Sequence, residues 1–208
     1  MPAAAGTVAR MPTTRLLLVR HGQSTWNADG RWQGQADPPL SDLGRHQAKE
    51  AARHLGQVDV IVASDLQRAS ETAEIIAGEL GVGPVELDEA LRERAAGPVT
   101  GLTREEIDER FPGVREGSVR PSGMEDDDAI VARAVPALRA LEGRGETVMV
   151  VTHGGLIGAV ERWCGADHDR IPNLGARIFE VDAGRLTTHG PLLLVDPNDV
   201  AVTSPPET

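Results

Sequence analysis

The sequence contains few cysteine, lysine and aromatic residues, and it has no long apolar run. Cys164 is the single cysteine, which excludes an internal disulfide and a cysteine-rich zinc site. Among 21 basic residues only Lys49 is a lysine, and tyrosine is absent. No apolar stretch approaches the roughly 20 residues that cross a bilayer, and residues 1–14 lack the roughly 7–15-residue apolar core of a signal peptide. We therefore expect a cytoplasmic protein that has no membrane partner.

The net charge and the length of the chain restrict the possible classes of protein further. The chain has 32 acidic against 21 basic residues, which gives a formal net charge of -11. Nucleic acids and anionic membrane surfaces bind basic patches, so this balance predicts no nucleic-acid partner. The 208 residues, of which 40% are hydrophobic, suit one globular domain. We expect a flexible leader at residues 1–14, a single domain at 15–195 and a polar tail at 196–208.

Short aliphatic runs alternate with helical patterns along the chain. Three continuous apolar runs lie at residues 16–19, 58–63 and 148–151. Such runs are typical of strands buried on both faces of a parallel sheet. Apolar residues at helical spacing predict helices over residues 42–55, 66–80 and about 126–141, and a fourth that starts near Gly155. Ser41 is the expected N-cap of the first helix, and Leu43 is expected on its inward face.

The end of the predicted domain has the pattern of a hairpin. Residues 177–181 and 185–186 flank the turn sequence Asp182-Ala183-Gly184. The last strands are therefore expected to be antiparallel and to lie at an edge, where two copies of the chain could pair as a homodimer. Together with the alternating strands and helices, this predicts an α/β three-layer sandwich with a mostly parallel central sheet and an antiparallel edge.

Charged and polar residues follow each of the three predicted central strands. The first strand is followed by Arg20-His21-Gly22, the second by Ser64 and Arg68, and the third by Thr152-His153-Gly154-Gly155. Because the carboxyl ends of parallel strands lie at one edge of a sheet, these residues should share one crevice. Arginine binds phosphate through its planar fork, and glycine lets backbone amides approach an anion closely. The crevice is therefore predicted to bind phosphate.

His21 is the candidate nucleophile of this site. Fixed positive charge from the two arginines would let a neutral imidazole approach a phosphate dianion. The departing oxygen also needs a proton, and Glu93, in a loop after residues 85–87, is the candidate donor. By composition alone the neighbouring carboxylates remain alternatives to it, namely Asp88, Glu89, Glu105 and Glu106. No His-x-His or His-x-x-x-His spacing is present, so no metal is expected.

Taken in order, these segments resemble the histidine phosphatase superfamily, in its branch similar to cofactor-dependent phosphoglycerate mutases. The Arg-His-Gly signature lies in Leu18-Val19-Arg20-His21-Gly22-Gln23-Ser24-Thr25-Trp26-Asn27. Further similar segments are Gln33-Gly34, the stretch from Pro39-Leu40-Ser41 to Gly44, the stretch from Ser64 to Ala73, Thr152-His153-Gly154-Gly155, and Asn173. The likeness covers residues 16–194.

The resemblance implies roles for individual residues, and no cofactor is expected for the predicted hydrolysis. It implies that His21 becomes a phosphohistidine, which water hydrolyses, that Glu93 donates the proton, and that Arg20 and His153 take part in catalysis. The residues that it implies for phosphate binding are Arg20, Asn27, Gln33, Gly34, Arg68, His153 and Gly154.

The chain departs from the family's pattern at two places. Val99-Thr100 stands where relatives commonly have Trp-Glu, and Met124-Glu125-Asp126 stands where they often have Gly-Glu-Ser. The first departure bears on the packing of the Glu93 loop, and the second bears on contacts to phosphate or substrate.

The predicted activity is hydrolysis of small-molecule phosphate monoesters through a phosphohistidine. The segment 101–133 is short compared with the mutases that the chain resembles. The acidic run 125–128 would repel the bisphosphate that a mutase must retain. The same acids are also typical of the start of a helix. The alternatives are a cofactor-dependent phosphoglycerate mutase, a degraded family member that acts as a binding module, and a metal hydrolase. Arginine beside a histidine disfavours the last, because it is a poor companion for a cation.

Overall fold

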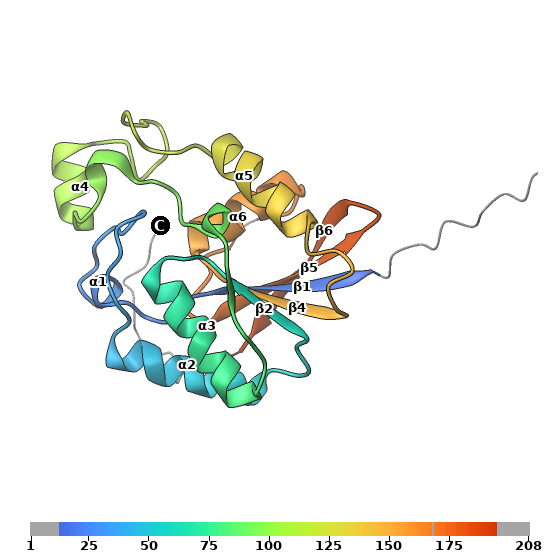
Figure 1. Ribbon diagram of the computed structural model, residues 1–208. Helices are drawn as coiled ribbons and strands as arrows, with labels where there is room; N and C mark the ends of the chain where they lie inside the picture. The colour runs from blue at the N-terminus through green and yellow to red at the C-terminus, as the bar shows by residue number, and fades with distance from the viewer. Residues whose placement is uncertain (1–12, 168, 195–208) are drawn as a thin grey trace, which may run out of the picture.

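The computed structural model describes residues 13–167 and 169–194. The first twelve residues of the predicted leader and the whole predicted tail therefore lie outside the described residues. Within the described part, strands and helices alternate as the sequence predicts (Figure 1).

A central sheet organises the described residues, with the strand order β3-β2-β4-β1-β5-β6. In chain order the strands are β1 (Thr14–Arg20), β2 (Val60–Ala63), β3 (Glu86–Leu87), β4 (Thr147–Thr152), β5 (Gly175–Asp182) and β6 (Arg185–Leu193). Neighbours among β3, β2, β4 and β1 are parallel, whereas β5 and β6 are antiparallel to their neighbours. The predicted mostly parallel sheet with an antiparallel edge is thus confirmed. Thr14, assigned above to the leader, opens β1 and is buried.

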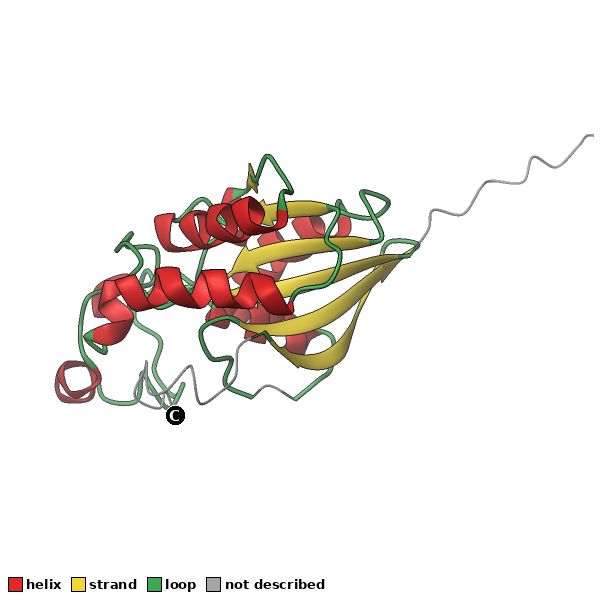
Figure 2. Ribbon diagram, turned by 90° about the horizontal axis from the view of Figure 1, so that it is seen from below, coloured by secondary structure: helices red, strands yellow, loops and turns green. Residues whose placement is uncertain are grey.

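Helices cover both faces of this sheet and complete the three layers (Figure 2). In chain order they are α1 (Thr25–Ala28), α2 (Asp42–His54), α3 (Gln67–Leu80), α4 (Arg104–Arg110), α5 (Asp127–Arg139) and α6 (Gly154–Trp163). Two short 3-10 helices, η1 and η2, lie at Glu89–Leu91 and Gly97–Val99. The pair α2 and α3 packs on one face of the sheet, and the pair α5 and α6 packs on the other (Figure 1). Within the described residues, no helix combines the length and the apolar character needed to cross a membrane.

The continuous apolar runs are explained by burial on both faces of the strands. In β1, Leu16 and Leu18 face the core under α5 and α6, whereas Leu17 and Val19 face the core over α2 and α3. The strand β4 alternates in the same way. The parallel pairing of β4 with both β1 and β2 brings these three strands side by side with their carboxyl ends at one edge.

Local capping sets the ends of the main helices. The Ser41 hydroxyl accepts the backbone N–H of Gly44 at 3.1 Å, and this confirms the predicted N-cap of α2. The helix α3 ends at Gly81, whose φ of +66° is a left-handed conformation that favours glycine. The expectation for Leu43 is wrong, because its side chain is 37% exposed. It stands one residue into the first turn of α2, where Gly44 makes the close contact with the loop that follows β1.

A third, smaller apolar cluster lies beyond the carboxyl edge of the sheet. It is formed by the buried residues Ala96, Val99, Ile107 and Val114, and Trp32, Leu102, Phe111 and Met124 pack against it. This cluster joins the loop after α1 to α4 and to the segments on either side of it (Figure 1). We call residues 96–124 the lid, because they lie over the strand ends that carry the candidate site.

Candidate active site

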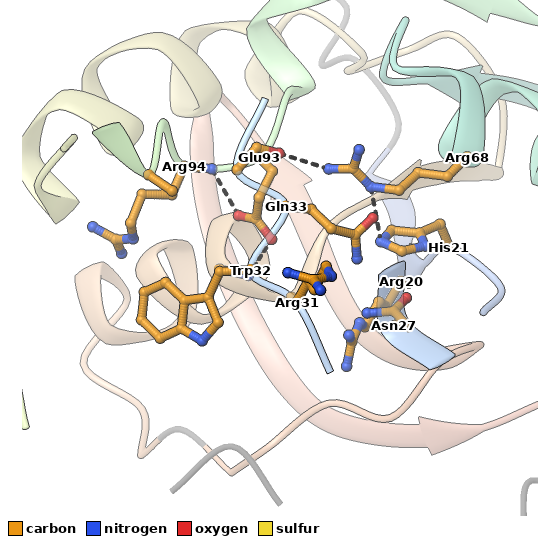
Figure 3. Close-up of a pocket in the computed structure, with 13 residues that line it drawn as sticks. Arg20, His21, Asn27, Arg31, Trp32, Gln33, Arg68, Glu93 and Arg94 are labelled. Carbon is orange, nitrogen blue, oxygen red and sulfur yellow. Dashed lines mark hydrogen bonds between the residues drawn. The ribbon is translucent and has the colours of Figure 1, made fainter. Parts of the chain in front are cut away.

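A pocket of about 180 Å³ opens at the carboxyl edge of the sheet. Its lining comes from the end of β1 and the loop after it, from α1 and the loop after it, from the loop after η1, from α3 and from the start of α6. It consists of Arg20, His21, Asn27, Arg31, Trp32, Gln33, Gly34, Arg68, Glu93, Arg94, Ala96, Gly154 and Gly155 (Figure 3). Segments far apart in sequence therefore meet in one crevice, as the positions of the strand ends predict.

Most of the residues expected at the site line this pocket. They are Arg20, His21, Asn27, Gln33, Gly34, Arg68, Glu93 and Gly154. His153 does not line it. The His153 side chain is completely buried behind the pocket, and its ring packs edge-on against that of His21 with 5.2 Å between the ring centroids.

Hydrogen bonds fix the orientation and tautomer of His21. Its Nδ1 lies 2.6 Å from the carbonyl oxygen of Gly22. A carbonyl can only accept, so Nδ1 carries the proton and Nε2 holds the lone pair. The Nε–H of Arg68 points at this Nε2 over 3.2 Å, which agrees with the same tautomer (Figure 3). The nucleophilic nitrogen is therefore Nε2.

Both histidines are held in the neutral form by their surroundings. Burial lowers the pKa of His21 well below its ordinary value, and the charges of Arg68 and Arg20 lower it further. Burial likewise lowers the pKa of His153, and Arg68, His21 and Arg20 add to the effect. At neutral pH His21 thus has an uncharged ring beside two cations, which is the state that a nitrogen nucleophile requires.

Arg20 and Arg68 supply the positive charge at the floor of the pocket. The Nη1 of Arg20 donates to the carbonyl of Ile171 at 2.7 Å. The two Nη atoms of Arg68 donate to the carbonyls of Ala36 and Gly34 at 2.7 and 2.8 Å. Burial lowers the pKa of Arg68 to about 10, so its side chain stays charged at neutral pH. Carbonyl groups orient both guanidinium groups without neutralising them.

Two buried polar atoms beside His21 have no hydrogen-bond partner among the described residues. They are Nε of Arg20 and Nδ1 of His153. The other ring nitrogen of His153, Nε2, lies 2.9 Å from the hydroxyl of Ser64 at the end of β2. Buried polar groups normally have partners, and exceptions gather where a ligand binds. The unmatched atoms are consistent with an oxyanion site around His21.

Small residues and short polar side chains hold the loop after β1 in place. The N–H of Gly22 donates to the Thr72 hydroxyl at 3.1 Å, and Asn173 donates to the carbonyl of His21 at 2.9 Å. A side chain at Gly22 would stand 2.6 Å from the carbonyl oxygen of Gly44. Asn173 and the segment of Thr72, both matched by the resemblance, thus support the nucleophile from behind.

Glu93 lies opposite His21 with its carboxylate at the start of α6. Its Oε1 accepts the N–H of Arg94 at 2.7 Å, and its Oε2 accepts the N–H of Gly155 at 3.1 Å (Figure 3). Among the described residues it is the only carboxylate that lines the pocket. The rival carboxylates lie elsewhere: Asp88 caps the helix η1, and Glu106 completes the capping box of α4.

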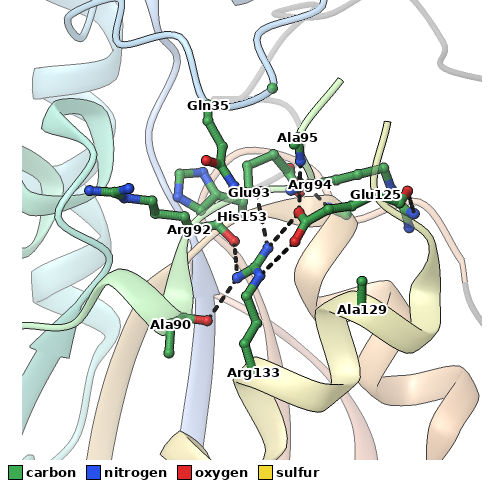
Figure 4. A network of polar contacts seen from close by, with 12 residues as sticks. Gln35, Ala90, Arg92, Glu93, Arg94, Ala95, Glu125, Ala129, Arg133 and His153 are labelled. Atoms are coloured by element: carbon green, nitrogen blue, oxygen red, sulfur yellow. Dashed lines mark hydrogen bonds and ion pairs between the residues drawn. The ribbon is translucent and has the colours of Figure 1, made fainter. Parts of the chain in front are cut away.

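The loop of Glu93 is tied to α5 through Arg133. Arg133 donates to the carbonyls of Ala90, Arg92 and Glu93, at 2.8, 2.7 and 3.1 Å respectively. It also makes two hydrogen bonds of 3.0 Å to the carboxylate of Glu125 (Figure 4). We call this pair, Arg133 with Glu125, the loop clamp.

Both departures from the family's pattern are accommodated outside the pocket. Val99 is fully buried in the lid cluster, and the Thr100 hydroxyl donates to the carbonyl of Gly97 at 2.8 Å. Met124 packs against the same cluster, Glu125 belongs to the loop clamp, and Asp126 is the N-cap of α5. None of these five residues lines the pocket.

Sequence reasoning missed four side chains of the pocket, namely Arg31, Trp32, Arg94 and Ala96. Arg31 and Trp32 directly precede the matched pair Gln33-Gly34, and Arg94 directly follows Glu93. Adjacency to matched residues was the one signal that could have found them. None of the four follows an apolar strand, so they were not selected by the strand-end rule that found Arg20, His21 and Gly154, and they are not among the residues that the resemblance implied.

The protein has an α/β sheet with a neutral histidine between two arginines at the carboxyl ends of its strands. This arrangement can bind a phosphate group and provides a nucleophile for it. The chain belongs to the histidine phosphatase superfamily (branch 1), whose family model matches residues 16–191. The match includes the segments of Arg20, His21, Arg68, Glu93 and His153.

Characterised relatives include phosphatases and mutases. The chain is 38% identical over 182 residues to glucosyl-3-phosphoglycerate phosphatase of Mycolicibacterium vanbaalenii, a match that covers 79% of this chain and 80% of that protein. It is 36% identical over 161 residues to 2,3-bisphosphoglycerate-dependent phosphoglycerate mutase of Methylorubrum extorquens, which covers 70% and 76%. A solved structure of mycobacterial glucosyl-3-phosphoglycerate phosphatase with VO3 matches with a TM-score of 0.74 and 34% identity, over 80% of this chain and 90% of that one.

Proposed function

We propose that the protein is a phosphatase that hydrolyses small-molecule phosphate monoesters through a phosphohistidine on Nε2 of His21. The observation that carries this proposal is the state of His21, which is neutral, oriented through Nδ1 and flanked by the cations Arg20 and Arg68. Relatives named as phosphatases support hydrolysis as the outcome of that chemistry.

The reaction takes place in two steps. In the first, Nε2 of His21 forms a bond to phosphorus, the bond from phosphorus to the ester oxygen breaks, and Glu93 gives that oxygen a proton. In the second, the oxygen of a water molecule forms a bond to phosphorus while Glu93 takes a proton from that water, the bond from phosphorus to Nε2 of His21 breaks, and phosphate leaves. Arg20, Arg68, Asn27 and the amides at the start of α6 stabilise the negative charge of the phosphoryl group in both steps.

Phosphoglycerate mutase is the alternative, because a mutase is among the relatives. The acidic run at residues 125–128 does not help to decide between the two. Glu125 is paired with Arg133, Asp126 caps α5, and Asp127 lies between Arg94 and Arg162. Asp126 is the N-cap of α5 and Asp127 and Asp128 lie in its first turn, which confirms the interpretation of this run as a helix start. Hydrolysis is favoured by the phosphatases among the relatives and by the short lid segment.

The proposal is tested by trapping the phosphoryl group. Rapid mixing with a 32P-labelled aryl phosphate should label the wild-type protein with an acid-labile, alkali-stable phosphate, and in the steady state phosphate should be released at the same rate as the phenol. His21→Ala should lose both the label and turnover. His46→Ala, at an exposed histidine of α2, is the matched control and should keep both.

Two results would contradict the proposal. Tight binding of phosphate without any labelling would indicate a binding module. Interconversion of 3- and 2-phosphoglycerate that needs bisphosphoglycerate and is faster than phosphate release would indicate a mutase. A cytoplasmic location, the absence of nucleic-acid partners and a homodimer that pairs through the β5–β6 edge remain predictions from the sequence.

A further inference from the structure

The two helices that begin at the pocket differ from the others in how their first turns are capped. The helices α2, α4 and α5 each begin with a side-chain cap of their own, at Ser41, Thr103 and Asp126 respectively. The N-cap positions of α3 and α6 are Leu66 and His153, whose side chains make no capping hydrogen bond to the described residues. The free backbone N–H groups of these two helices therefore need acceptors from elsewhere in the chain.

Asp37, in the loop after α1, provides the acceptor for α3. Its Oδ1 accepts the N–H of Gln67, the first residue of that helix, at 2.6 Å. By sequence the first turn of α3 contains no acidic residue, so Asp37 also brings the negative charge that a helix N-terminus favours. Glu93 plays the same part for α6 through the N–H of Gly155. Arg68 directly follows Gln67, so the hydrogen bond of Asp37 fixes the turn from which Arg68 extends.

The loop that carries Asp37 also holds the guanidinium of Arg68. The carbonyls of Gly34 and Ala36 accept hydrogen bonds from its two Nη atoms at 2.8 and 2.7 Å. Its Nε–H points at Nε2 of His21 over 3.2 Å (Figure 3). The hydrogen bond of Asp37 to α3 joins the loop that orients this guanidinium to the helix that carries it.

We propose that Asp37 is a positioning residue for Arg68, which it holds in place for the phosphoryl group by capping α3 from the loop after α1. This inference rests on the proposed function, in which Arg68 stabilises the negative charge of the phosphoryl group. Asp37 is exposed and is not among the described residues that line the pocket. It therefore acts through Arg68 and makes no contact with the substrate.

The same loop has a second connection to the site, and kinetics distinguish the two. Gln35 donates to the backbone carbonyl of Glu93 at 3.1 Å, so the loop also contacts the segment of the proton donor. An effect on Arg68 changes the binding of the phosphoryl group, which is common to all substrates. An effect on Glu93 changes protonation of the leaving oxygen, and its size depends on the leaving group.

The test is a double-mutant cycle on the binding of inorganic phosphate, measured by calorimetry. Asp37→Ala should raise the Kd of phosphate by about tenfold, the effect of a lost helix cap. In an Arg68→Gln background the same substitution should change the Kd by less than about twofold, because the residue through which Asp37 acts is gone. Asp37→Ala should also lower kcat/KM by the same factor for an alkyl and for an aryl phosphate.

Gln67→Pro is a second variant that removes the donor of the same hydrogen bond. Proline suits the first position of a helix, and Leu66 has an extended ψ of 131° that tolerates a following proline. This variant should therefore stay folded and should weaken phosphate binding as Asp37→Ala does. Asp42→Ala is the matched control, because Asp42 is an exposed acid in the first turn of α2. It should leave the Kd unchanged in both backgrounds.

Three results would overturn the inference. The first is an unchanged Kd in Asp37→Ala or in Gln67→Pro. The second is a double variant whose Kd shows the full product of the two single effects. The third is a loss of kcat/KM confined to the alkyl phosphate, which would assign the loop to Glu93. In all three cases His21 still takes up the 32P label, whereas failure of the proposed function removes the label from the wild-type protein.

Discussion

Gly155 stands where any side chain would meet the carboxylate of Glu93. A Cβ at this position would lie 2.4 Å from Oε1 of Glu93 and 3.1 Å from its Cδ. The backbone of Gly155 is in the first turn of α6, so alanine suits its conformation. The absence of a side chain at Gly155 therefore leaves room for the carboxylate of Glu93, and the helix itself does not require glycine here.

We expect Gly155→Ala to separate activity from stability. The carboxylate is the end of a flexible side chain and can move aside, so the free energy of unfolding should stay the same or rise by up to about 1 kcal/mol. The displaced Glu93 would protonate the leaving oxygen poorly. The kcat for an alkyl phosphate should therefore fall by about 10- to 100-fold, and the kcat for an aryl phosphate with an acidic leaving group should fall much less.

Gly78→Ala is the matched control for that substitution. Gly78 lies in α3, and a Cβ there would meet no atom within 4 Å. Gly78→Ala should leave kcat unchanged for both the alkyl and the aryl phosphate. Urea unfolding should show that both glycine variants are folded. An equal loss of activity on both esters in Gly155→Ala would contradict the role given to this glycine.

At the level of single residues, positions directly after a buried strand are easier to predict from the sequence than positions within a loop. Arg20, His21 and Gly154 were found because each comes at the end of an aliphatic run, and parallel strands bring those positions together. Arg31 comes from a loop in which no periodicity determines where a side chain points. The position of His153 behind the pocket could not be predicted from the sequence either, because burial of the residue after a strand depends on how the neighbouring helix packs.

The loop clamp connects two elements that are distant in sequence, α5 and the loop after η1. Arg133 donates to the carbonyl of Ala90 in η1 and to two carbonyls of that loop, while Glu125 accepts the N–H of Ala95 at 2.8 Å (Figure 4). Hydrogen bonds from Arg133 and Ala95 lower the pKa of the Glu125 carboxyl although burial alone would raise it, so the pair is ionic. Arg133 thus acts as a positioning residue for Glu93 without lining the pocket.

Removing Arg133 should loosen this loop and reduce proton donation by Glu93. We expect Arg133→Gln to lower kcat for an alkyl phosphate by about tenfold, and to lower it less for an aryl phosphate with an acidic leaving group. A half-buried, unpaired Glu125 should also cost about 1–3 kcal/mol of the free energy of unfolding. Steady-state kinetics with esters of graded leaving-group pKa, together with urea unfolding, measure both effects.

Arg139→Gln provides the control on the same helix, because Arg139 is exposed and stacks on Trp163. It should leave the dependence of kcat on the leaving group unchanged. If Arg133→Gln lost activity by the same factor on every ester, or kept full activity, the loop clamp would have no role in positioning Glu93.

Elements with a long periodic pattern could be predicted, and the lid could not. The helices α2, α3, α5 and α6 each bury a regular apolar face against the sheet, so their spacing reveals them. The helix α4 has only seven residues and buries only Ile107, which is too little for a periodic signal. Its stability depends on contacts with Trp32 and with the segment around Met124, and these contacts exist only in the folded chain. The order of the strands across the sheet likewise follows from tertiary packing.

At the scale of the whole molecule, the buried pair His21 and His153 couples the active site to stability. Their pKa values in the folded protein lie well below the value of about 6.5 that an unfolded chain gives them. Between these two values the unfolded chain binds more protons than the folded protein does. The free energy of unfolding must therefore fall as the pH falls below about 6.5.

We expect this fall to be about 1.4 kcal/mol per pH unit for each of the two histidines once the pH is well below 6.5. Urea unfolding at pH 7.5, 6.5, 5.5 and 5.0 gives the slope. Carboxyls such as Asp65 and Asp127, whose pKa values are lowered by hydrogen bonds from arginine against the effect of burial, lose their stabilising effect only at lower pH. The double variant His21→Asn, His153→Asn should therefore be nearly flat from pH 6.5 to 5.0, whereas the control His54→Asn, at an exposed residue of α2, should keep the wild-type slope. Equal slopes in the double variant and the wild-type protein would mean that the two buried rings accept protons in the folded state, and that His21 does not remain the neutral nucleophile as the pH falls below 6.5.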